Sequence, residues 1–479
     1  MSQTDKSQGG REKSGTPKVF SQQDIAELSK NLTGNLYLTE SKNYNEKKEG
    51  WALTVQHEPA IIIEVKNTDD VITAINFAGK HQLFIAVQST GHGASHPCID
   101  HMLIKTTEMN GFSINIASQT IRTEAGATWE NILKESQRWG LVPLTGFVGN
   151  VGVTGYTIGG GFGWLVRKYG IAADQLLSLE MVTLKGEILT VTADEHPDLF
   201  WGVCGGGNFG IITALTMKLF PIKDMLASQF YYLPSKAEEV MEMYRNATQQ
   251  FPEEMTSTLT MMHLPPVSPL PEALKELPYV VSVKAVYLGD KNTGERLLAQ
   301  FKDLDPVYEK QEMMSYQEAS QISHDPKSPA KAYGHVEIVN EFSEGLTGIL
   351  SKLIAGNDTV KPVIEIRHIG GAMAKVPAGK NAFGHRDTKY MLHIEIPLIG
   401  KTTIESSADY LHSLHEGVKP FVTGGTFLNF IGNVDISDEA VKAAFEEDDY
   451  ARLRELKRQY DPGNVLRFNF NIPPAAETS

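Results

Sequence analysis

The sequence predicts an α+β protein built from two main domains, and three observations support this prediction. The chain has 479 residues, which exceeds the usual length of a single domain. Residues 18–221 alternate short apolar strands, short helices and glycine-rich turns. Residues 222–450 contain more charge and proline and alternate long helical patterns with strands. This pattern in residues 222–450 favours an antiparallel sheet covered by helices.

Composition and charge restrict the classes of partner. Hydrophobic residues make up 41% of the chain and charged residues 21%, as in a globular protein. The formal net charge of −14 argues against nucleic acid or an anionic membrane surface as partner. The two cysteines, Cys98 and Cys204, cannot build a disulfide framework or a Cys-x-x-Cys site, and no metal is expected. Residues 1–17 are polar, so we expect a disordered tail and a cytoplasmic protein without a membrane span.

The first domain opens with a helix over residues 20–32, which Ser21 can cap, and continues with a strand–helix–strand unit. Buried strands are predicted at 61–65 and 83–87, and Asn67 supplies an N-cap for the helix between them. The second strand runs into the small-residue loop 88–93, whose consecutive N–H groups suit a pyrophosphate. The loop is neither a P-loop nor a Rossmann fingerprint, because no Gly-Lys-Ser/Thr follows and no helix opens directly behind its glycines.

Further elements lead to the glycine-rich centre of the chain and beyond it. Strands are predicted at 102–104, 112–116 and 120–124, followed by a helix over 129–139 with Trp139 on its apolar side. Eight of the 18 residues from Gly146 to Gly163 are glycine, yet the remainder are apolar enough to be buried. Such a backbone can approach a large, flat, phosphate-bearing cofactor closely. The alternative is a tightly packed turn region without a ligand.

The remaining elements complete both domains. A hairpin is predicted over 173–192, a short helix over 195–201, and a third glycine cluster at 205–210 that leads into a strand over 211–220. The second domain should contain strands at 280–287, 363–369 and 389–397. A helix over 450–460, a turn at 461–464 and a final strand over 465–472 end the ordered chain.

Four motifs in this order resemble the berberine-bridge-enzyme-like branch of the FAD-linked oxidases, the vanillyl-alcohol-oxidase superfamily. They are the Gly-His loop at 87–93, the glycine run at 146–163, the Trp-Gly-Val-Cys-Gly-Gly-Gly-Asn-Phe-Gly segment at 201–210, and Tyr-Asp-Pro-Gly-Asn-Val-Leu-Arg-Phe-Asn-Phe-Asn at 460–471. The resemblance implies a PCMH-type FAD-binding domain of two α/β subdomains over 18–221. It also implies a substrate domain over 222–450 and a segment, 451–479, that returns to the FAD-binding domain.

The resemblance also implies which residues hold FAD. His92 matches the histidine that bonds the flavin 8α-carbon, although it could instead only hydrogen-bond the cofactor. Val148 stands at or beside the position of the cysteine that bonds the flavin in many relatives, so no 6-S-cysteinyl bond is expected. Gln88 replaces the usual arginine, and Cys204, also at a position where arginine is commoner, is expected to be a small buried residue. The predicted FAD-binding residues are Gln88, Ser89, Thr90, Gly91, His92, Gly93, His96, Val148, Gly149, Gly152, Val153, Gly155, Tyr156, Gly159, Gly160, Gly163, Gly210, Ile211, Ile212, Asn469 and Asn471.

The catalytic base is less obvious, because Phe427 stands where relatives often have the tyrosine of a Tyr-x-Asn segment. A phenyl ring cannot accept a proton. Tyr390, His393 and His368 are the catalytic candidates, with His385 as a further one. Strand alternation prevents Tyr390 and His393 from facing one site without a bulge. The substrate could instead lose an easy proton without a base.

We therefore expect an oxidase or dehydrogenase that removes hydride from a small alcohol, sugar or amine to flavin N5. Oxygen or another acceptor would take the electrons, and the protein would be a monomer or homodimer. A flavin-binding protein without turnover is the alternative that Phe427 and Gln88 favour. A nicotinamide-dependent dehydrogenase is disfavoured because the strand–GxGxxG–helix unit is missing.

Overall fold

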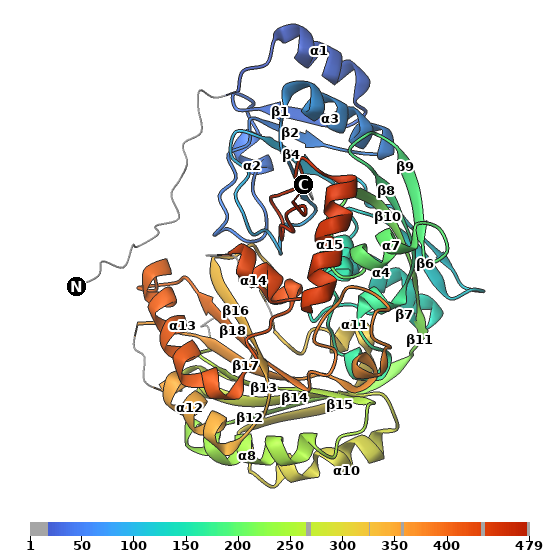
Figure 1. Cartoon of the computed structure of the whole chain (residues 1–479). Helices are drawn as coiled ribbons and strands as arrows, with labels where there is room; N and C mark the ends of the chain where they lie inside the picture. The colour runs from blue at the N-terminus through green and yellow to red at the C-terminus, as the bar shows by residue number, and fades with distance from the viewer. Residues whose placement is uncertain (1–17, 265–269, 325, 356–358, 433–435, 477–479) are drawn as a thin grey trace.

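The computed structural model describes residues 18–264, 270–324, 326–355, 359–432 and 436–476 (Figure 1). The predicted tail 1–17 lies outside the described residues. The described chain forms four sheets of four, five, two and seven strands. No helix in the described ranges is long and apolar enough to cross a membrane.

The first sheet contains the predicted strand–helix–strand unit. Its strands β1 (Asn35–Leu38), β2 (Ile61–Glu64), β3 (Ile85–Gln88) and β4 (Met102–Lys105) lie in the order β1-β2-β4-β3. β4 runs parallel to both β2 and β3. The Asn67 side chain accepts a hydrogen bond from the Asp70 N–H and so caps α3 (Thr68–His81), and Ser21 caps α1 (Gln22–Asn31) in the same way, as predicted.

The second sheet is antiparallel throughout. It consists, in spatial order, of β5 (Phe112–Asn115), β6 (Thr120–Glu124), β10 (Ile211–Lys218), β8 (Leu176–Val182) and β9 (Ile188–Thr192). The β8–β9 pair is the predicted hairpin. The chain between β6 and β8 forms α4 (Trp129–Ser136), the 3-10 turn η1 (Gln137–Trp139), β7 (Leu141–Val142), α5 (Val153–Ile158), α6 (Val166–Tyr169) and η2 (Ala172–Gln175). The prediction for Trp139 is wrong: the helix tightens into η1 before it, and the indole is 55% exposed.

The largest sheet has seven strands, and every neighbouring pair of them is antiparallel. Its order is β15 (Tyr308–Ser315), β12 (Asp224–Tyr232), β14 (Val280–Tyr287), β13 (Met255–Met262), β17 (Val363–His368), β18 (Tyr390–Pro397) and β16 (Ala332–Val339). One face buries an apolar cluster against α8 (Ala237–Thr248), α10 (Lys291–Lys302), α12 (Glu344–Ala355) and α13 (Ile404–Val418). Figure 1 shows these helices on the outer side of the sheet. Its other face is not covered by these helices and faces the rest of the molecule (Figure 1).

Short elements connect these parts. They are α2 (Tyr44–Lys47), α7 (Pro197–Val203), β11 (Phe220–Pro221), α9 (Glu272–Lys275), α11 (Tyr316–Ala319), α14 (Asp438–Lys442) and six 3-10 turns among the described residues, including η6 (Leu428–Phe430).

The C-terminal segment returns to the first two sheets. Helix α15 (Glu447–Tyr460) lies beside α7, where Arg452 pairs with Asp198 (Figure 1). The chain beyond it was expected to be a strand, but residues 465–472 are irregular. Polar side chains hold this segment, together with a backbone hydrogen bond from the Ile85 N–H of the edge strand β3 to the Val465 carbonyl at 3.0 Å. The Asp461 carboxylate accepts hydrogen bonds from the N–H groups of Val465 and Leu466 at 2.7 and 2.9 Å.

Candidate functional site

A cavity of about 490 Å³ lies between the first two sheets and the inner face of the seven-stranded sheet. Its walls come from parts of segments 86–96, 146–159, 206–212, 428–432 and 466–470, together with residues of β16, β17 and β18. The three glycine-rich segments that the sequence singled out therefore meet at one place. Sixteen of the 21 predicted FAD-binding residues line it.

The first wall is the loop that follows β3. Gly91 has φ +80°, and a Cβ there would lie 2.8 Å from the Cα of Gly50, so only glycine fits. The His92 imidazole stacks on Trp51, with ring centroids 4.2 Å apart, and its Nδ1 lies 2.8 Å from Thr90 Oγ1. Burial lowers the pKa of His92 to about 4, so the ring is neutral at neutral pH. Trp51 could not be identified from the sequence, because stacking across this loop depends on the tertiary fold.

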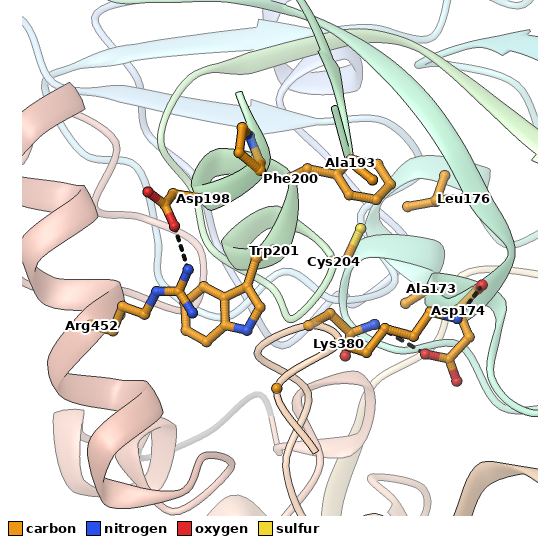
Figure 2. Close-up of a pocket in the computed structure, with 13 residues that line it drawn as sticks. Ala173, Asp174, Leu176, Ala193, Asp198, Phe200, Trp201, Cys204, Lys380 and Arg452 are labelled. Carbon is orange, nitrogen blue, oxygen red and sulfur yellow. Dashed lines mark hydrogen bonds and ion pairs between the residues drawn. The ribbon is translucent and has the colours of Figure 1, made fainter. Parts of the chain in front are cut away.

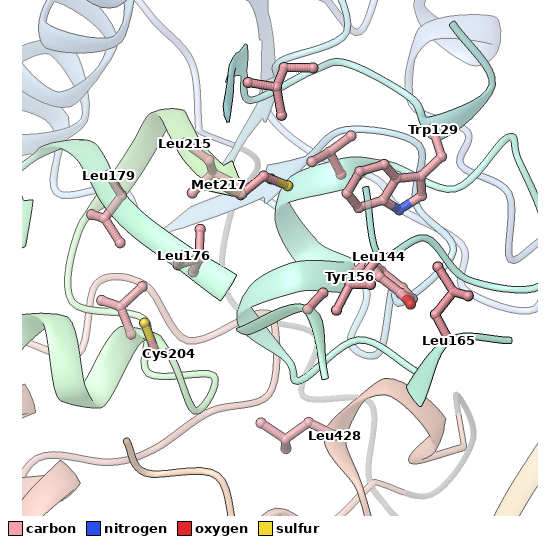
Figure 3. Close-up of a cluster of buried hydrophobic side chains, with 14 of the residues drawn as sticks. Trp129, Leu144, Tyr156, Leu165, Leu176, Leu179, Cys204, Leu215, Met217 and Leu428 are labelled. Carbon is pink, nitrogen blue, oxygen red and sulfur yellow. The ribbon is translucent and has the colours of Figure 1, made fainter. Parts of the chain in front are cut away.

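The central glycine run forms a short helix rather than an open loop. Residues 153–158 are α5, whose Tyr156 ring packs edge-on against Trp129 within a large apolar cluster (Figure 3). Val148, Gly152, Gly155, Tyr156 and Gly159 line the cavity as predicted. This cluster holds the helix rigidly against the cavity.

Four predicted residues of this run do not line the cavity, which corrects their assignment. The Gly149 carbonyl accepts from the Glu130 N–H, and Val153 is fully buried in the apolar cluster. A Cβ at Gly160 would lie 2.6 Å from Phe383, and one at Gly163 would lie 1.8 Å from the carbonyl oxygen of Thr145. These glycines permit close packing between distant segments, which the sequence could not distinguish from contact with a ligand.

The third glycine cluster and the C-terminal segment close the opposite side. Gly210, Ile211 and Ile212 line the cavity as predicted, and so does Asn469, whose Nδ2 donates to the carbonyl of Val87 at 3.4 Å. Asn471 is not part of the lining, and its prediction is corrected. The aromatic rings of Phe468 and Phe470, which the sequence did not single out, are part of the wall.

The seven-stranded sheet supplies the charged wall. His393 lines the cavity from β18 and Arg367 lines it from β17. The Arg367 guanidinium lies between the rings of Phe147 and Phe430, at 4.4 and 4.9 Å from their centroids. Its Nε donates to a carboxylate oxygen of Glu365 at 2.7 Å and forms a salt bridge with it.

Two of the three predicted catalytic residues lie elsewhere. Tyr390 is on the helix-covered face of β18, where its hydroxyl is bonded to Thr248 Oγ1 at 2.8 Å. The His368 ring stacks on Tyr390 and its Nε2 is 2.8 Å from an Arg167 Nη. Strand alternation separates Tyr390 from His393, as expected, and the sheet order decides which of them faces the cavity. Neither Tyr390 nor His368 is positioned for catalysis there.

His385 and Phe427, which were also considered from the sequence, do not line the cavity. The His385 Nε2 lies 2.8 Å from the carbonyl oxygen of Ala443, outside the cavity lining. Phe427 is buried among Phe162 and Phe383. Asn429, two residues later, lines the cavity and accepts a hydrogen bond from the Gly161 N–H at 2.6 Å.

A group of buried polar atoms along the cavity lacks hydrogen-bond partners among the described residues. They are His57 Nε2, Gln88 Oε1, Ser89 Oγ, His92 Nε2, Tyr156 OH and Arg367 Nη1. Buried polar atoms are normally satisfied, so their concentration indicates a ligand with several polar groups. Aromatic and aliphatic walls between them suit a flat apolar ring system. The glycine loops, the aromatic and aliphatic walls and these atoms together fit FAD.

A second cavity of about 310 Å³ shares no lining residue with the first. It lies between α7, residues 379–381 and α15, and Arg452 covers the Trp201 ring at 3.9 Å (Figure 2). Cys204 is at its wall, and burial raises the pKa of this thiol far above its usual value. The side chain is therefore the small buried residue that the sequence predicts, and not a nucleophile.

Comparison with known proteins agrees with this geometry. Two family models match the chain, "FAD binding domain" over residues 59–192 and "Berberine and berberine like" over residues 426–473. An FAD-linked oxidoreductase of Dictyostelium discoideum is 26% identical over 461 residues, covering 94% of this chain and 97% of the relative. The (R)-6-hydroxynicotine oxidase of Paenarthrobacter nicotinovorans is also 26% identical over 461 residues, covering 92% and 97%.

The fold is likewise shared with a solved structure. The crystal structure of 6-hydroxy-D-nicotine oxidase from Arthrobacter nicotinovorans matches 93% of this chain and 98% of that one, with a TM-score of 0.80 and 22% identity. Family models, relatives aligned over more than nine tenths of this chain and the shared fold therefore agree: the chain contains an FAD binding domain and a berberine and berberine like domain, and it is similar to FAD-linked oxidoreductases over almost its whole length.

Proposed function

We propose that this protein oxidises a small alcohol, sugar or amine with FAD held covalently through His92, and that oxygen or another acceptor then takes the electrons. FAD, when bound, supplies the hydride-accepting N5. The protein has to hold the donor, exclude water and accept a proton. The single observation that carries the proposal is the His92 imidazole, which lines the cavity and whose buried Nε2 has no hydrogen-bond partner among the described residues.

The surroundings of His92 favour a covalent bond. The stack on Trp51 fixes the plane of the ring, and the contact with Thr90 occupies Nδ1. The lowered pKa keeps the imidazole neutral, which leaves a lone pair for bonding. We infer that Nε2 is the linked nitrogen.

A second covalent bond is not proposed, because neither cysteine reaches the cavity. Cys98 is fully buried and its Sγ contacts the carbonyl oxygen of Met102 at 3.5 Å, while Cys204 lines the smaller cavity. Val148 is at the wall where a 6-S-cysteinyl residue would stand in relatives. One histidyl bond is the proposed attachment.

His393 is the proposed proton acceptor. It is the one predicted catalytic residue that lines the cavity, and it faces the same space as Arg367 and Glu395. The relative named 6-hydroxynicotine oxidase supports an amine among the possible donors. A cytoplasmic location and a monomer or homodimer remain predictions.

Anaerobic titration with candidate donors tests the proposed reaction. We expect amines, alcohols or sugars that fit the cavity to bleach the flavin absorbance without oxygen, and air to restore it. Simple aldehydes and carboxylates, which lack a hydride-donating carbinol or amine carbon, serve as controls. A flavin that stays oxidised with every donor class would contradict the proposal and favour a binding protein without turnover.

The attachment has its own prediction. We expect protein precipitated with acid to keep its yellow colour, and the His92→Ala variant to release all flavin into the supernatant. His96→Ala is the matched control, because His96 also lines the cavity but its Nδ1 contacts the neighbouring Ser95 Oγ at 3.2 Å. Mass spectrometry of the digested protein should find the flavin mass on the peptide that contains His92. Free flavin from the unmodified protein would refute covalent attachment.

A further inference from the structure

Three potential metal ligands converge on the helix-covered side of the seven-stranded sheet. His335 and Glu337 are two residues apart on β16 and so share a face, and His415 reaches them from α13. One carboxylate oxygen of Glu337 lies 2.9 Å from His335 Nε2 and 2.7 Å from His415 Nδ1. We propose that this His-Glu-His cluster binds a divalent metal ion of the Zn²⁺ class.

The burial of Glu337 is the first argument. Its side chain is only 5% exposed, on a strand face whose other members include Tyr333 and Val339 of the apolar cluster. A buried anion of this kind requires a compensating cation or strong donors. A metal ion supplies the positive charge directly.

The donor set is the second argument. Two imidazoles and one carboxylate suit Zn²⁺ and related borderline ions rather than Mg²⁺ or Ca²⁺, which prefer oxygen ligands. The three ligating atoms lie within 4.8 Å of one another. Ligands about 2.0–2.2 Å from a tetrahedral Zn²⁺ lie roughly 3.3–3.5 Å apart, so small rotations of the imidazoles suffice. The imidazoles are 36% and 41% exposed, which leaves room for entry of the ion and for a water ligand.

The site is separate from the flavin cavity. Ala332 and Gly334 line that cavity, whereas His335, Glu337 and His415 do not. A metal here would join α13 to β16, the edge strand of the sheet. Its role is therefore structural: it stabilises the folded state by mass action and leaves the oxidation chemistry unchanged.

Calorimetric titration of tag-free, chelator-treated holoprotein with ZnCl₂ tests the proposal. We expect one ion per chain with a micromolar or tighter Kd, and a rise in the thermal unfolding midpoint when Zn²⁺ is added. Because His415→Ala and His335→Ala each remove a direct ligand, we expect each to weaken binding by more than the roughly 10–100-fold that loss of an outer-shell partner costs. Glu337→Gln, which keeps the shape of the side chain but removes its charge, should weaken Zn²⁺ binding in the same way.

His412 provides the matched control. It lies one turn before His415 on the same helix and is exposed, so His412→Ala should bind Zn²⁺ like the unmodified chain. Flavin content and the unfolding midpoint without metal verify that each variant is folded. Absence of saturable Zn²⁺ binding, or equal binding by the His412 and His415 variants, would overturn the proposal. Either result leaves the proposed oxidase function untouched, because donor oxidation is measured separately.

Discussion

Replacing His393 with glutamine is expected to lower the rate of flavin reduction by about 10²–10⁴-fold, the usual contribution of a general base. The imidazole is held at the cavity by its neighbours, because its Nδ1 lies 3.5 Å from an Arg367 Nη and 3.8 Å from Glu365. Glutamine preserves the approximate size but cannot accept the proton. Stopped-flow measurement of anaerobic flavin reduction at saturating donor gives this rate directly.

The pH dependence of the same rate provides a second readout. Burial, followed by the charge of Arg367, lowers the pKa of His393. A base must be deprotonated to act, so the rate should stay constant from neutral pH down to this lowered pKa and fall only below it. The His393→Gln variant should lose this acidic decline.

A structural histidine is the control for this prediction. His385→Gln removes the imidazole that is bonded to the Ala443 carbonyl, and His385 lies outside the cavity lining. Its rate should remain close to that of the unmodified protein. Equal losses in both variants would show that His393 contributes structure rather than proton transfer.

Replacing Asp461 with alanine is expected to destabilise the protein by about 3–5 kcal/mol, the cost of leaving one member of a buried ion pair alone. Lys457 and Asp461 are 2.7 Å apart and both side chains are fully buried. The Lys457 ammonium also donates to the carbonyl oxygens of Asn208 and Leu466, at 2.9 and 3.0 Å. The substitution therefore removes the carboxylate partner of a buried cation and of two backbone N–H groups at once.

The reciprocal variant, Lys457→Met, should cost less. Asp461 keeps the N–H donors of Val465 and Leu466, whereas the cation in Asp461→Ala keeps only carbonyl partners. Glu455→Ala is the control, because its pairing with Arg458 is about half exposed and such pairs contribute about 0–1 kcal/mol. Chemical denaturation of the holoprotein measures all three. A loss below about 1 kcal/mol in Asp461→Ala would show that the buried pair does not stabilise the fold.

Local patterns predicted the elements, whereas tertiary packing decided the roles of individual residues. The caps at Ser21 and Asn67 and the β8–β9 hairpin depend on neighbouring residues, and the sequence predicted them. Gly160 and Gly163 looked like cofactor contacts, because a glycine beside a ligand and one beside Phe383 or Thr145 are identical in sequence. The alternation along β18 was predictable, but which face turns inward depends on strands and helices far along the chain.

The final segment illustrates the same limit. Residues 465–472 carry apolar residues typical of a strand, yet among the described residues a single backbone hydrogen bond, from the Ile85 N–H to the Val465 carbonyl, joins them to the edge strand β3. Their position instead depends on Asp461 and Lys457, whose burial cannot be deduced from a charged helix end. The role of Trp51 could not be predicted for a related reason, because its contact with His92 joins two loops that are separate in the sequence.

The two ends of the cavity wall have a consequence for biosynthesis. The loop with His92 is translated long before Phe468, Asn469 and Phe470, which complete the wall of the cavity. The compartment for the dinucleotide therefore stays open on this side until these residues have been synthesised. A polypeptide shortened by a premature stop before Leu466 would be left without this wall, even though every glycine turn had already been synthesised.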